Sequence, residues 1–201
     1  VLRRPRPVED YIAVLESNLE EIDRMSRIVE ELLFLSRADM GQVKTECEPV
    51  RLEALVEDIQ RQACLLGQER EIDVIMGTIQ PATVRGDELR LRELILNLVD
   101  NAVKYSHPRG KVEIDLRVEG ATARLAVRDY GIGIPQDAHK QIFDRFFRTD
   151  DARAHTKKGT GLGLAICAWI ADAHHGHIDV QSEVGKGSTF TLVLPLAPAA
   201  A

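Results

Sequence analysis

Aromatic residues are scarce in this 201-residue sequence, where Phe, Trp and Tyr together make up 4%. A hydrophobic core must therefore be built mainly from Leu, Ile, Val and Ala. No stretch approaches the roughly 20 consecutive apolar residues that span a bilayer, and no secretory signal peptide is present. Because the sequence begins with Val1 rather than Met, we expect a fragment of a longer protein, and the absence of a membrane span describes this chain and not its parent.

Paired cysteines and an excess of positive charge are also missing. Cys47, Cys64 and Cys167 form no CxxC pair and no metal-ligand spacing, which favours reduced, structural thiols. The 26 Lys and Arg are outnumbered by 32 Asp and Glu, for a net charge of -6. This balance disfavours a general nucleic-acid or anionic-membrane binder. The remaining composition, 44% hydrophobic and 29% charged, is typical of a soluble globular protein.

A long amphipathic helix is predicted after the prolines of residues 1–7. Its heptad seam alternates in steps of four and three and consists of Leu15, Leu19, Ile22, Ser26, Val29, Leu33 and Ser36. Such a broad apolar face on about thirty residues requires partner helices, as in a four-helix bundle. A single helix packed on its own domain is the alternative. We expect residues 1–40 to be one arm of a helical hairpin and residues 41–50 to be a linker.

An α+β domain is predicted for residues 51–196, followed by a tail at 197–201. Helices and antiparallel strands in one unit indicate a two-layer α/β sandwich. The polar, Gly-rich stretch 130–161 is too long for a passive loop, and we expect a mobile lid there. Helices are predicted at 52–67, 87–105 and 162–174, and strands at 71–76, 82–86, 111–118, 121–129 and in a hairpin over 177–195.

The helix predicted over 87–105 carries a polar stripe. Glu93, Asn97, Asn101 and Lys104 follow one another in steps of four, four and three residues, so they share one face. Carboxamide oxygens are neutral, hard ligands, so the two asparagines could share a Mg²⁺ whose other ligands are phosphates and water. Lys104 would add positive charge for the same phosphates. An exposed polar face is the alternative, although Asn is a poor helix former.

Asp129 ends a predicted strand on the side of its buried residues, where a carboxylate needs hydrogen bonds. Gly131 and Gly133 follow and allow the backbone to approach a flat ligand closely. The carboxylate is suited to the exocyclic amine of adenine, and a plain Asp-Gly turn is the alternative. A second Gly-rich motif leads into a helix whose N–H groups could bind an anion; its glycines are Gly159, Gly161 and Gly163.

Five motifs in this order and spacing resemble the N, G1, F, G2 and G3 boxes of sensor histidine kinases of two-component systems. They are N-L-V-D-N-A-V-K-Y-S (97–106), D-Y-G-I-G (129–133), F-D-R-F-F-R (143–148), G-T-G-L-G-L (159–164) and G-K-G-S-T-F (185–190). The match covers residues 51–195, and residues 1–40 resemble the end of the dimerisation hairpin of the same kinases. The sequence of that helix is similar to those of the heavy-metal-responsive subgroup of these kinases.

The resemblance implies the Bergerat fold shared with gyrase, Hsp90 and MutL (the GHKL type), with helices on one face of a mixed sheet and with ATP and Mg²⁺ bound. By this resemblance Asn101 is the main Mg²⁺ ligand and Asn97 assists it. Lys104, Tyr105 and Asp129 contact the nucleotide, the last at adenine, and Arg148 reaches the terminal phosphate. The remaining nucleotide-binding positions implied are Gly131, Gly133, Gly159, Thr160, Gly161, Leu162, Gly163, Leu164 and Thr189.

Asn97 separates a kinase from an ATPase. The ATPase relatives carry Glu at this position to activate water, and an amide cannot act as that base. The resemblance therefore implies a protein-histidine kinase that transfers the γ-phosphoryl group of ATP to a His and then to an Asp of a response regulator. A GHKL-type ATPase switch and a non-catalytic nucleotide-binding scaffold are the alternatives. The full-length protein is expected to be a homodimer, with this chain as the cytoplasmic domain of a bacterial inner-membrane protein.

The acceptor histidine is missing from this sequence. None of the six histidines lies in the H-E-x-R-x-P-type box that sensor kinases present on their first hairpin helix; they are His107, His139, His155, His174, His175 and His177. We therefore expect that the chain alone cannot autophosphorylate. The cluster at 174–177 could indicate a metal site, but a structural helix end is the favoured interpretation.

Overall fold

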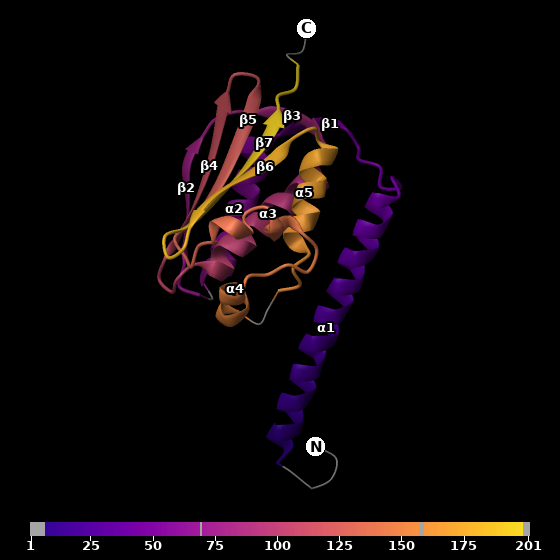
Figure 1. The fold of residues 1–201 in the computed structure, drawn as a ribbon, viewed down its shortest axis with the longest axis vertical. Coiled ribbons are helices and arrows are strands. Elements are labelled where there is room, and N and C mark those ends of the chain that lie inside the picture. The colour runs from indigo at the N-terminus through magenta and orange to yellow at the C-terminus, as the bar shows by residue number, and fades with distance from the viewer. Residues whose placement is uncertain (1–6, 69, 157–158, 199–201) are drawn as a thin grey trace. The chain divides into compact units, whose positions relative to one another are not determined.

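The computed structural model describes residues 7–68, 70–156 and 159–198. The chain divides into two compact units, residues 1–43 and 44–201. In the first unit, one helix, α1 (Val8–Asp39), follows Pro7 and carries Glu9 and Asp10 in its first turn (Figure 1). Proline at a helix start and acidic residues in the first turn both favour helix initiation there. The predicted long helix is confirmed.

The apolar seam of α1 faces solvent. Leu15 and Leu19 are each 61% exposed, and Ile22 and Val29 are also exposed. The buried residues of this helix are Leu35 and Ala38, near its C-terminus. Exposed apolar surface is unfavourable in water, so the expectation that this seam packs against another helix stays a prediction.

The second unit is built on a mixed five-stranded sheet in the order β2-β4-β5-β7-β6. β2 and β4 are parallel, and the other neighbouring pairs are antiparallel. A two-stranded antiparallel sheet pairs β1 with β3. The strands are β1 (Glu48–Arg51), β2 (Asp73–Ile79), β3 (Thr83–Gly86), β4 (Lys111–Glu119), β5 (Thr122–Asp129), β6 (His177–Glu183) and β7 (Gly187–Pro195).

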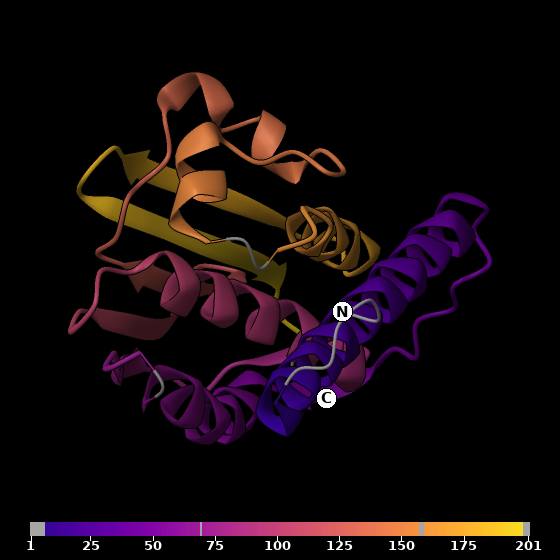
Figure 2. The ribbon, with the colours of Figure 1, turned by 90° about the horizontal axis from the view of Figure 1, so that it is seen from below.

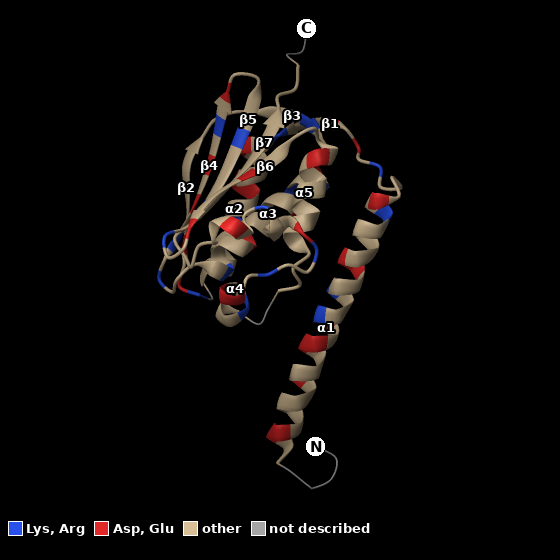
Figure 3. Cartoon of the chain, viewed as in Figure 1, with Lys and Arg blue, Asp and Glu red and all other residues tan. Residues whose placement is uncertain are grey.

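The sheet has one buried and one charged face. Along β4, Val112, Ile114 and Leu116 are fully buried, Glu113 and Asp115 between them are half-buried, and Lys111 and Arg117 at either end are exposed. Figure 3 shows charged residues on the strands of this sheet. The buried face is covered by the helices α2 (Leu52–Gln68), α3 (Glu88–Tyr105) and α5 (Gly163–Ala173). Alternation of period two thus produces the two-layer sandwich, and the predicted fold class is confirmed.

Helix α3 is central to this layer. Its N-cap Asp87 accepts a hydrogen bond from the Arg90 N–H at 3.1 Å, which satisfies one free donor of the first turn. Its buried side is entirely aliphatic and consists of Leu91, Leu94, Ile95, Leu98, Val99, Ala102 and Val103. In Figure 2, α3 lies between α2 and the described parts of residues 130–161, which we call the lid.

The lid contains more helix than the sequence indicated. It forms the short helix α4 (Asp150–His155) and two 3₁₀ turns at Gln136–Ala138 and Gln141–Phe143. The Thr149 side chain caps α4 by accepting from the Ala152 N–H at 3.2 Å. Six residues give less than two turns, so no helical period was visible in the sequence.

Three further properties of the described residues bear on the expectations from sequence. Strand β2 continues to Ile79, beyond the predicted end at residue 76, through a register irregularity between Met76 and Ile79. The three cysteines are free thiols, and burial raises the pKa of the Cys167 thiol. Among the described residues no helix is both long enough and apolar enough to cross a membrane.

Candidate nucleotide-binding site

Asp129 is a buried carboxylate at the end of β5. Asp129 is only 4% exposed, which confirms the prediction that it lies on the buried side of the sheet. Its Oδ1 accepts a hydrogen bond from the Gly131 N–H at 2.9 Å. Burial raises the pKa of Asp129, while hydrogen bonds from Gly131 and from Ser188, and the nearby charge of His107, act in the opposite direction.

The turn after Asp129 contacts two other segments of the chain. A Cβ at Gly131 would clash with the backbone of Tyr105, and the Ile132 N–H donates to the Tyr105 carbonyl at 3.2 Å. Gly133 has a φ of +70°, and a Cβ there would clash with the carbonyl of Glu183. Only glycine fits both the close approach and the left-handed backbone at this position. The turn is thus held between the end of α3 and the β6–β7 hairpin.

Asn97 and Asn101 lie one turn apart on α3, and both are half-buried. A Cβ at Gly163 would lie 3.5 Å from Asn97 Oδ1, so this carboxamide faces the first residue of α5. Within the described part of the chain, neither asparagine side chain makes a hydrogen bond. Two uncommitted carboxamide oxygens on one helix face fit a hard cation such as Mg²⁺.

The two charged residues of the stripe are already paired. Glu93 accepts from Arg90 at 2.8 Å, and the Lys104 ammonium binds the Asp100 carboxylate. The sequence motifs did not single out Asp100, although its spacing of four residues before Lys104 is a usual ion-pair spacing in helices. A phosphate that uses the charge of Lys104 must therefore compete with Asp100 or share the ammonium with it.

Arg148 binds the lid's own backbone. Its guanidinium donates to the carbonyls of Ala152 at 2.7 Å, Thr156 at 2.6 Å and Gly159 at 3.3 Å. Its Nε is buried and has no hydrogen-bond partner among the described residues. Arg148 therefore links the carbonyls of Ala152 and Thr156 to that of Gly159. Its expected contact with a terminal phosphate stays a prediction.

Tyr105 faces a lid residue that no sequence motif selected. The rings of Tyr105 and His155 have centroids 6.2 Å apart and are inclined by 38°. The Nε2 of His155 is buried without a hydrogen-bond partner in the described residues. Since α4 showed no period in the sequence, nothing in the sequence indicated that His155 lies beside the end of α3.

The second Gly-rich motif packs against the F box. The Phe146 N–H donates to the Gly161 carbonyl at 2.9 Å, and a Cβ at Gly161 would lie 2.8 Å from the Phe146 backbone. Leu162 is fully buried, and Thr160 accepts from its N–H at 3.2 Å. Leu162 is also the N-cap of α5 and offers no side-chain cap, so N–H groups of the first turn stay available for an anion.

Three further residues of this motif are half-buried, namely Gly159, Gly163 and Leu164. Lys157 and Lys158, which precede the motif, lie outside the described residues. The glycine at 163 is also the first residue of α5, so the motif leads directly into a helix, as predicted.

Ser188, rather than its neighbour Thr189, contacts Asp129. Ser188 is 6% exposed and donates hydrogen bonds to Asp129 through its backbone and its side chain. Thr189 is half-buried and pairs across the sheet with Arg128 and Gln181. Ser188 shares the face of the buried Phe190 two residues later, so strand alternation was the signal that could have found it.

His174, the first histidine of the cluster at 174–177, has a structural role. His174 is buried, its Nε2 accepts from the Asp87 N–H at 2.9 Å, and its Nδ1 donates to the Ile170 carbonyl at 2.7 Å. Both ring nitrogens are thus used to join α5 to the start of α3. Across the described ranges, no group of three or more His, Cys, Asp or Glu could hold a metal ion.

Comparison with known families decides what this geometry represents. A family model described as histidine kinase-, DNA gyrase B-, and HSP90-like ATPase matches residues 86–198, more than half of the chain. The chain belongs to this family. The match begins just before α3 and ends after β7, so it contains Asp129, both asparagines and the lid.

Three relatives place the chain among the sensor kinases. The sensor protein SrrB of Staphylococcus aureus (strain N315) is 32% identical over 195 residues, which are 97% of this chain and 33% of that protein. The mycobacterial sensor histidine kinase MprB has a TM-score of 0.65 and 31% identity, covering 76% of this chain and 99% of that chain. Full-length ShkA in complex with AMPPNP has a TM-score of 0.81 and 30% identity, covering 96% of this chain and 40% of that chain.

These similarities confirm the expected family. The chain contains the catalytic ATP-binding domain of a sensor histidine kinase, and it spans about a third of the length of the curated relatives it matches. SrrB and MprB are named as sensor proteins and not as gyrase-type switches, so the ATPase alternative gains no support from them.

Proposed function

We propose that this chain binds Mg-ATP and forms the catalytic part of a protein-histidine kinase. The observation that carries the proposal is the combination, in one unit, of the buried carboxylate of Asp129 with the uncommitted carboxamides of Asn97 and Asn101. An acceptor-only carboxylate suits an amine on a base, and carboxamides suit a hard cation on phosphates. The AMPPNP in the ShkA structure supports a similar ligand here.

Asp129 is the residue that would recognise adenine. Its carboxylate would accept a hydrogen bond from the exocyclic amine, in an environment already prepared by Gly131 and Ser188. Guanine presents a carbonyl oxygen at the corresponding position. Two acceptors facing each other leave a buried group unpaired, which is costly. We therefore expect ATP to bind more tightly than GTP.

The polar stripe and the start of α5 would bind the phosphates. Asn101 would be the main Mg²⁺ ligand and Asn97 would assist it, and Lys104 would place its charge on the same phosphates. When bound, Mg²⁺ would neutralise charge that develops during phosphoryl transfer. The N–H groups of the first turn of α5 would bind the same anionic group. Arg148 would exchange lid carbonyls for the terminal phosphate.

Asn97 also favours a protein acceptor over water. Its amide cannot remove a proton from water. The acid one turn earlier, Glu93, is held in an ion pair with Arg90 at 2.8 Å. Without a base for water, the γ-phosphoryl group is kept for a nucleophile brought by the protein, and catalysis works by positioning and charge neutralisation.

The rest of the pathway is inferred from the resemblance to sensor kinases. The acceptor His would lie on a dimerisation helix outside residues 1–201, and the phosphoryl group would pass from it to an Asp of a response regulator. Residues 1–40 would form the second arm of that hairpin in a homodimer, joined by the linker 41–50 to the catalytic domain 51–196. The chain would be the cytoplasmic part of an inner-membrane protein.

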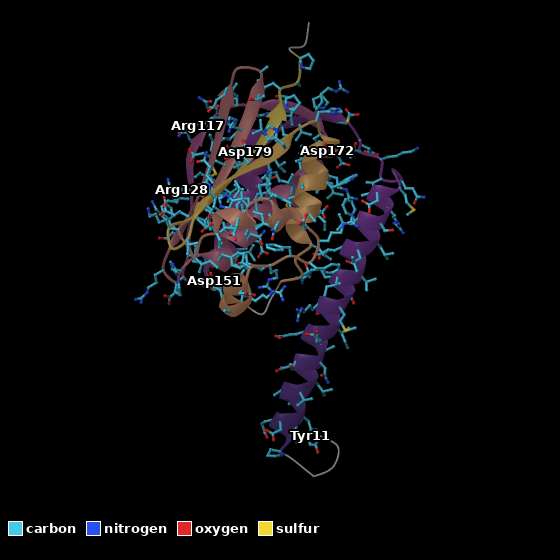
Figure 4. The ribbon with its side chains drawn as sticks, viewed as in Figure 1. Tyr11, Arg117, Arg128, Asp151, Asp172 and Asp179 are labelled. Carbon is cyan, nitrogen blue, oxygen red and sulfur yellow. The ribbon has the colours of Figure 1, made fainter. Side chains whose placement is uncertain are left out.

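Calorimetric titration with Mg-ATP tests the proposal. Wild type should bind, and Asp129→Asn should weaken the affinity by about 100-fold, since an amide in this place presents a donor to a donor. Asp179→Asn is the matched control, because Asp179 lies on β6 with a side chain 48% exposed (Figure 4), and its affinity should equal that of wild type. Phosphate release in the same samples should stay near background.

Three outcomes would contradict parts of this proposal. Rapid phosphate release would identify an ATPase. Failure of the wild type to bind any nucleotide would exclude the catalytic role. Acid-labile phosphate on the isolated chain after incubation with labelled ATP would show that one of its own histidines is an acceptor.

A further inference from the structure

Ser182 is a half-buried residue of β6 that lies outside all five sequence motifs. We propose that Ser182 is a positioning residue that fixes Ser188 and the start of the lid around Asp129, and thereby sets the preference for adenine over guanine. This inference rests on the proposed function, because it concerns the recognition of ATP at the same site. It assigns a specificity role to a hydroxyl that does not itself touch Asp129.

The Ser182 hydroxyl joins three segments of the chain. Its Oγ accepts from the Ile134 N–H, in the lid, at 2.8 Å. It also lies 2.9 Å from the Gly187 carbonyl, at the start of β7, and 2.9 Å from the Oγ of Ser188. Since Ser188 in turn donates to Asp129, one oxygen atom connects the lid to the partner of the adenine-binding carboxylate.

The proton count of this cluster makes Ser182 decisive. A hydroxyl has one proton and two lone pairs, and the Ile134 N–H occupies one lone pair. The Ser182 proton can go to the Gly187 carbonyl or to Ser188, but not to both. If the Ser182 proton goes to Ser188, the hydroxyl proton of Ser188 is free to bind Asp129. If the Ser182 proton goes to the Gly187 carbonyl, Ser188 must donate its own proton to Ser182 to keep a hydrogen bond between the two hydroxyls. Ser182 therefore controls the donor that Asp129 receives.

The backbone segments around Ser182 and Asp129 are closely packed against one another. A Cβ at Gly187 would clash with the Asp129 carbonyl, and a Cβ at Gly133 would clash with the Glu183 carbonyl. The Gly185 N–H donates to the Ile132 carbonyl at 2.8 Å. The β6–β7 hairpin is thus in direct contact with the whole turn from Asp129 to the lid. A shift of the β6–β7 hairpin would therefore move both the Asp129 carboxylate and the first residues of the lid.

Nucleotide selectivity is the property that such a shift should change. Discrimination between an amine and a carbonyl depends on a fixed acceptor, since a mobile carboxylate can turn away from a mismatched group. Removing the Ser182 hydroxyl takes away the contact that ties the β6–β7 hairpin to the Ile134 N–H, so the Asp129 carboxylate should be held less firmly and match adenine less well, without an effect on contacts that ATP and GTP share. A residue that merely stabilises the hairpin would reduce the binding of both nucleotides equally.

The test compares Mg-ATP and Mg-GTP affinities of the 201-residue chain and its variants by calorimetry. Ser182→Ala should weaken ATP binding about tenfold while GTP binding stays within about twofold, so the ratio falls about tenfold. Ser182→Thr keeps the hydroxyl and should restore the ratio. Thr122→Val is the matched control, because Thr122 donates to the Glu119 carbonyl at 2.9 Å at the opposite end of β5; it should behave as wild type.

Hydrogen exchange of the Ile134 amide is the second measurement. It should be faster in Ser182→Ala than in wild type and unchanged in Thr122→Val, because only the first variant removes its acceptor. If Ser182→Ala does not fold, Ser182→Cys replaces it, since a thiol is nearly the same size but a weak hydrogen-bonding group.

The outcomes separate this inference from the proposed function. An unchanged ATP-to-GTP ratio in a folded Ser182→Ala or Ser182→Cys protein, or an equal loss of both affinities, overturns the role of Ser182 and leaves ATP binding intact. Failure of the wild type to bind ATP refutes the proposed function and this inference with it.

Discussion

The candidate site has two parts, a floor and a lid, that are built differently. We define the floor as α3, β5 and Ser188. Its key groups are buried: Asp129 is 4% exposed, and Leu98 beneath the stripe is fully buried. In the lid, α4 buries none of its residues, all of which the structure describes. The polar lid side chain Arg148 binds lid carbonyls and not the floor.

The difference shows which part of the site is preorganised. The Asp129 end is fixed by strand pairing and by contacts of the turn with α3 and the β6–β7 hairpin. At the phosphate end, the Lys104 ammonium already pairs with Asp100, and Arg148 already donates to the Thr156 carbonyl, so a phosphate must compete for these cations or share them. Adenine recognition should therefore cost little reorganisation, whereas closing the lid over phosphates should cost more.

The largest expected difference between floor and lid concerns stability. Leu98→Ala should lower the free energy of unfolding by about 2 to 5 kcal/mol, because it leaves a cavity in the aliphatic core. Leu89→Ala, on the same helix but 68% exposed, should change it by less than about 0.5 kcal/mol. The lid variant Phe146→Ala should resemble Leu89→Ala, since Phe146 is exposed. Urea unfolding measures all three, and a costly Phe146→Ala would mean that the lid belongs to the core.

Loss of a cation ligand from the floor should have the next largest effect. If Asn101 is the main Mg²⁺ ligand, as we propose, Asn101→Ala should weaken Mg-ATP binding by about 30-fold, because it removes that carboxamide. Asn18→Ala makes the same change on α1 and should leave the affinity unaltered. Titration at several Mg²⁺ concentrations gives the readout, and equal losses with and without Mg²⁺ would argue against a ligand role for Asn101.

A lid variant should affect the phosphates alone and by a smaller factor. If Arg148 binds the terminal phosphate, as we propose, Arg148→Ala should weaken Mg-ATP binding about tenfold and Mg-ADP binding no more than about twofold. Lys140→Ala removes one positive charge from an exposed position of the same lid and controls for long-range attraction. If ATP and ADP binding fell equally, Arg148 would act only by holding Ala152, Thr156 and Gly159.

Most of the floor could be predicted from the sequence because its segments are long and periodic. The helix predicted at 87–105 is observed at Glu88–Tyr105, and the strand predicted at 121–129 is observed at Thr122–Asp129. Alternation along that strand sufficed to place Asp129 inside. The Asn97 and Asn101 stripe follows from helical spacing alone.

The rest depends on contacts between segments far apart in the chain, which periodicity does not report. Helix α4 is too short for a visible period and is set by its Thr149 cap. Ser188 and Ser182 acquire their roles only when the β6–β7 hairpin meets the turn after Asp129. The orientation of Arg148 toward its own loop is a property of the folded lid. The sequence could place these residues on elements but could not assign their partners.

The smallest expected effect uses pH to separate a floor carboxylate from a lid carboxylate. Burial raises the pKa of Asp129 above its ordinary 3.8, so its stabilising contribution is complete below that value and is lost as the pH rises through the raised pKa. Asp129→Asn should therefore gain stability relative to wild type as the pH rises, until the carboxyl is fully ionised.

Urea unfolding of the nucleotide-free protein between about pH 4.5 and 7 measures this difference. Asp151→Asn makes the same change at an exposed position on α4 (Figure 4) and is the matched control. His107 is the titratable group that acts on Asp129, so His107→Gln should be combined with both variants. A parallel pH profile of Asp129→Asn and wild type would mean that the carboxylate is solvated in the free protein, and the floor would then be no better prepared for adenine than the lid is for phosphate.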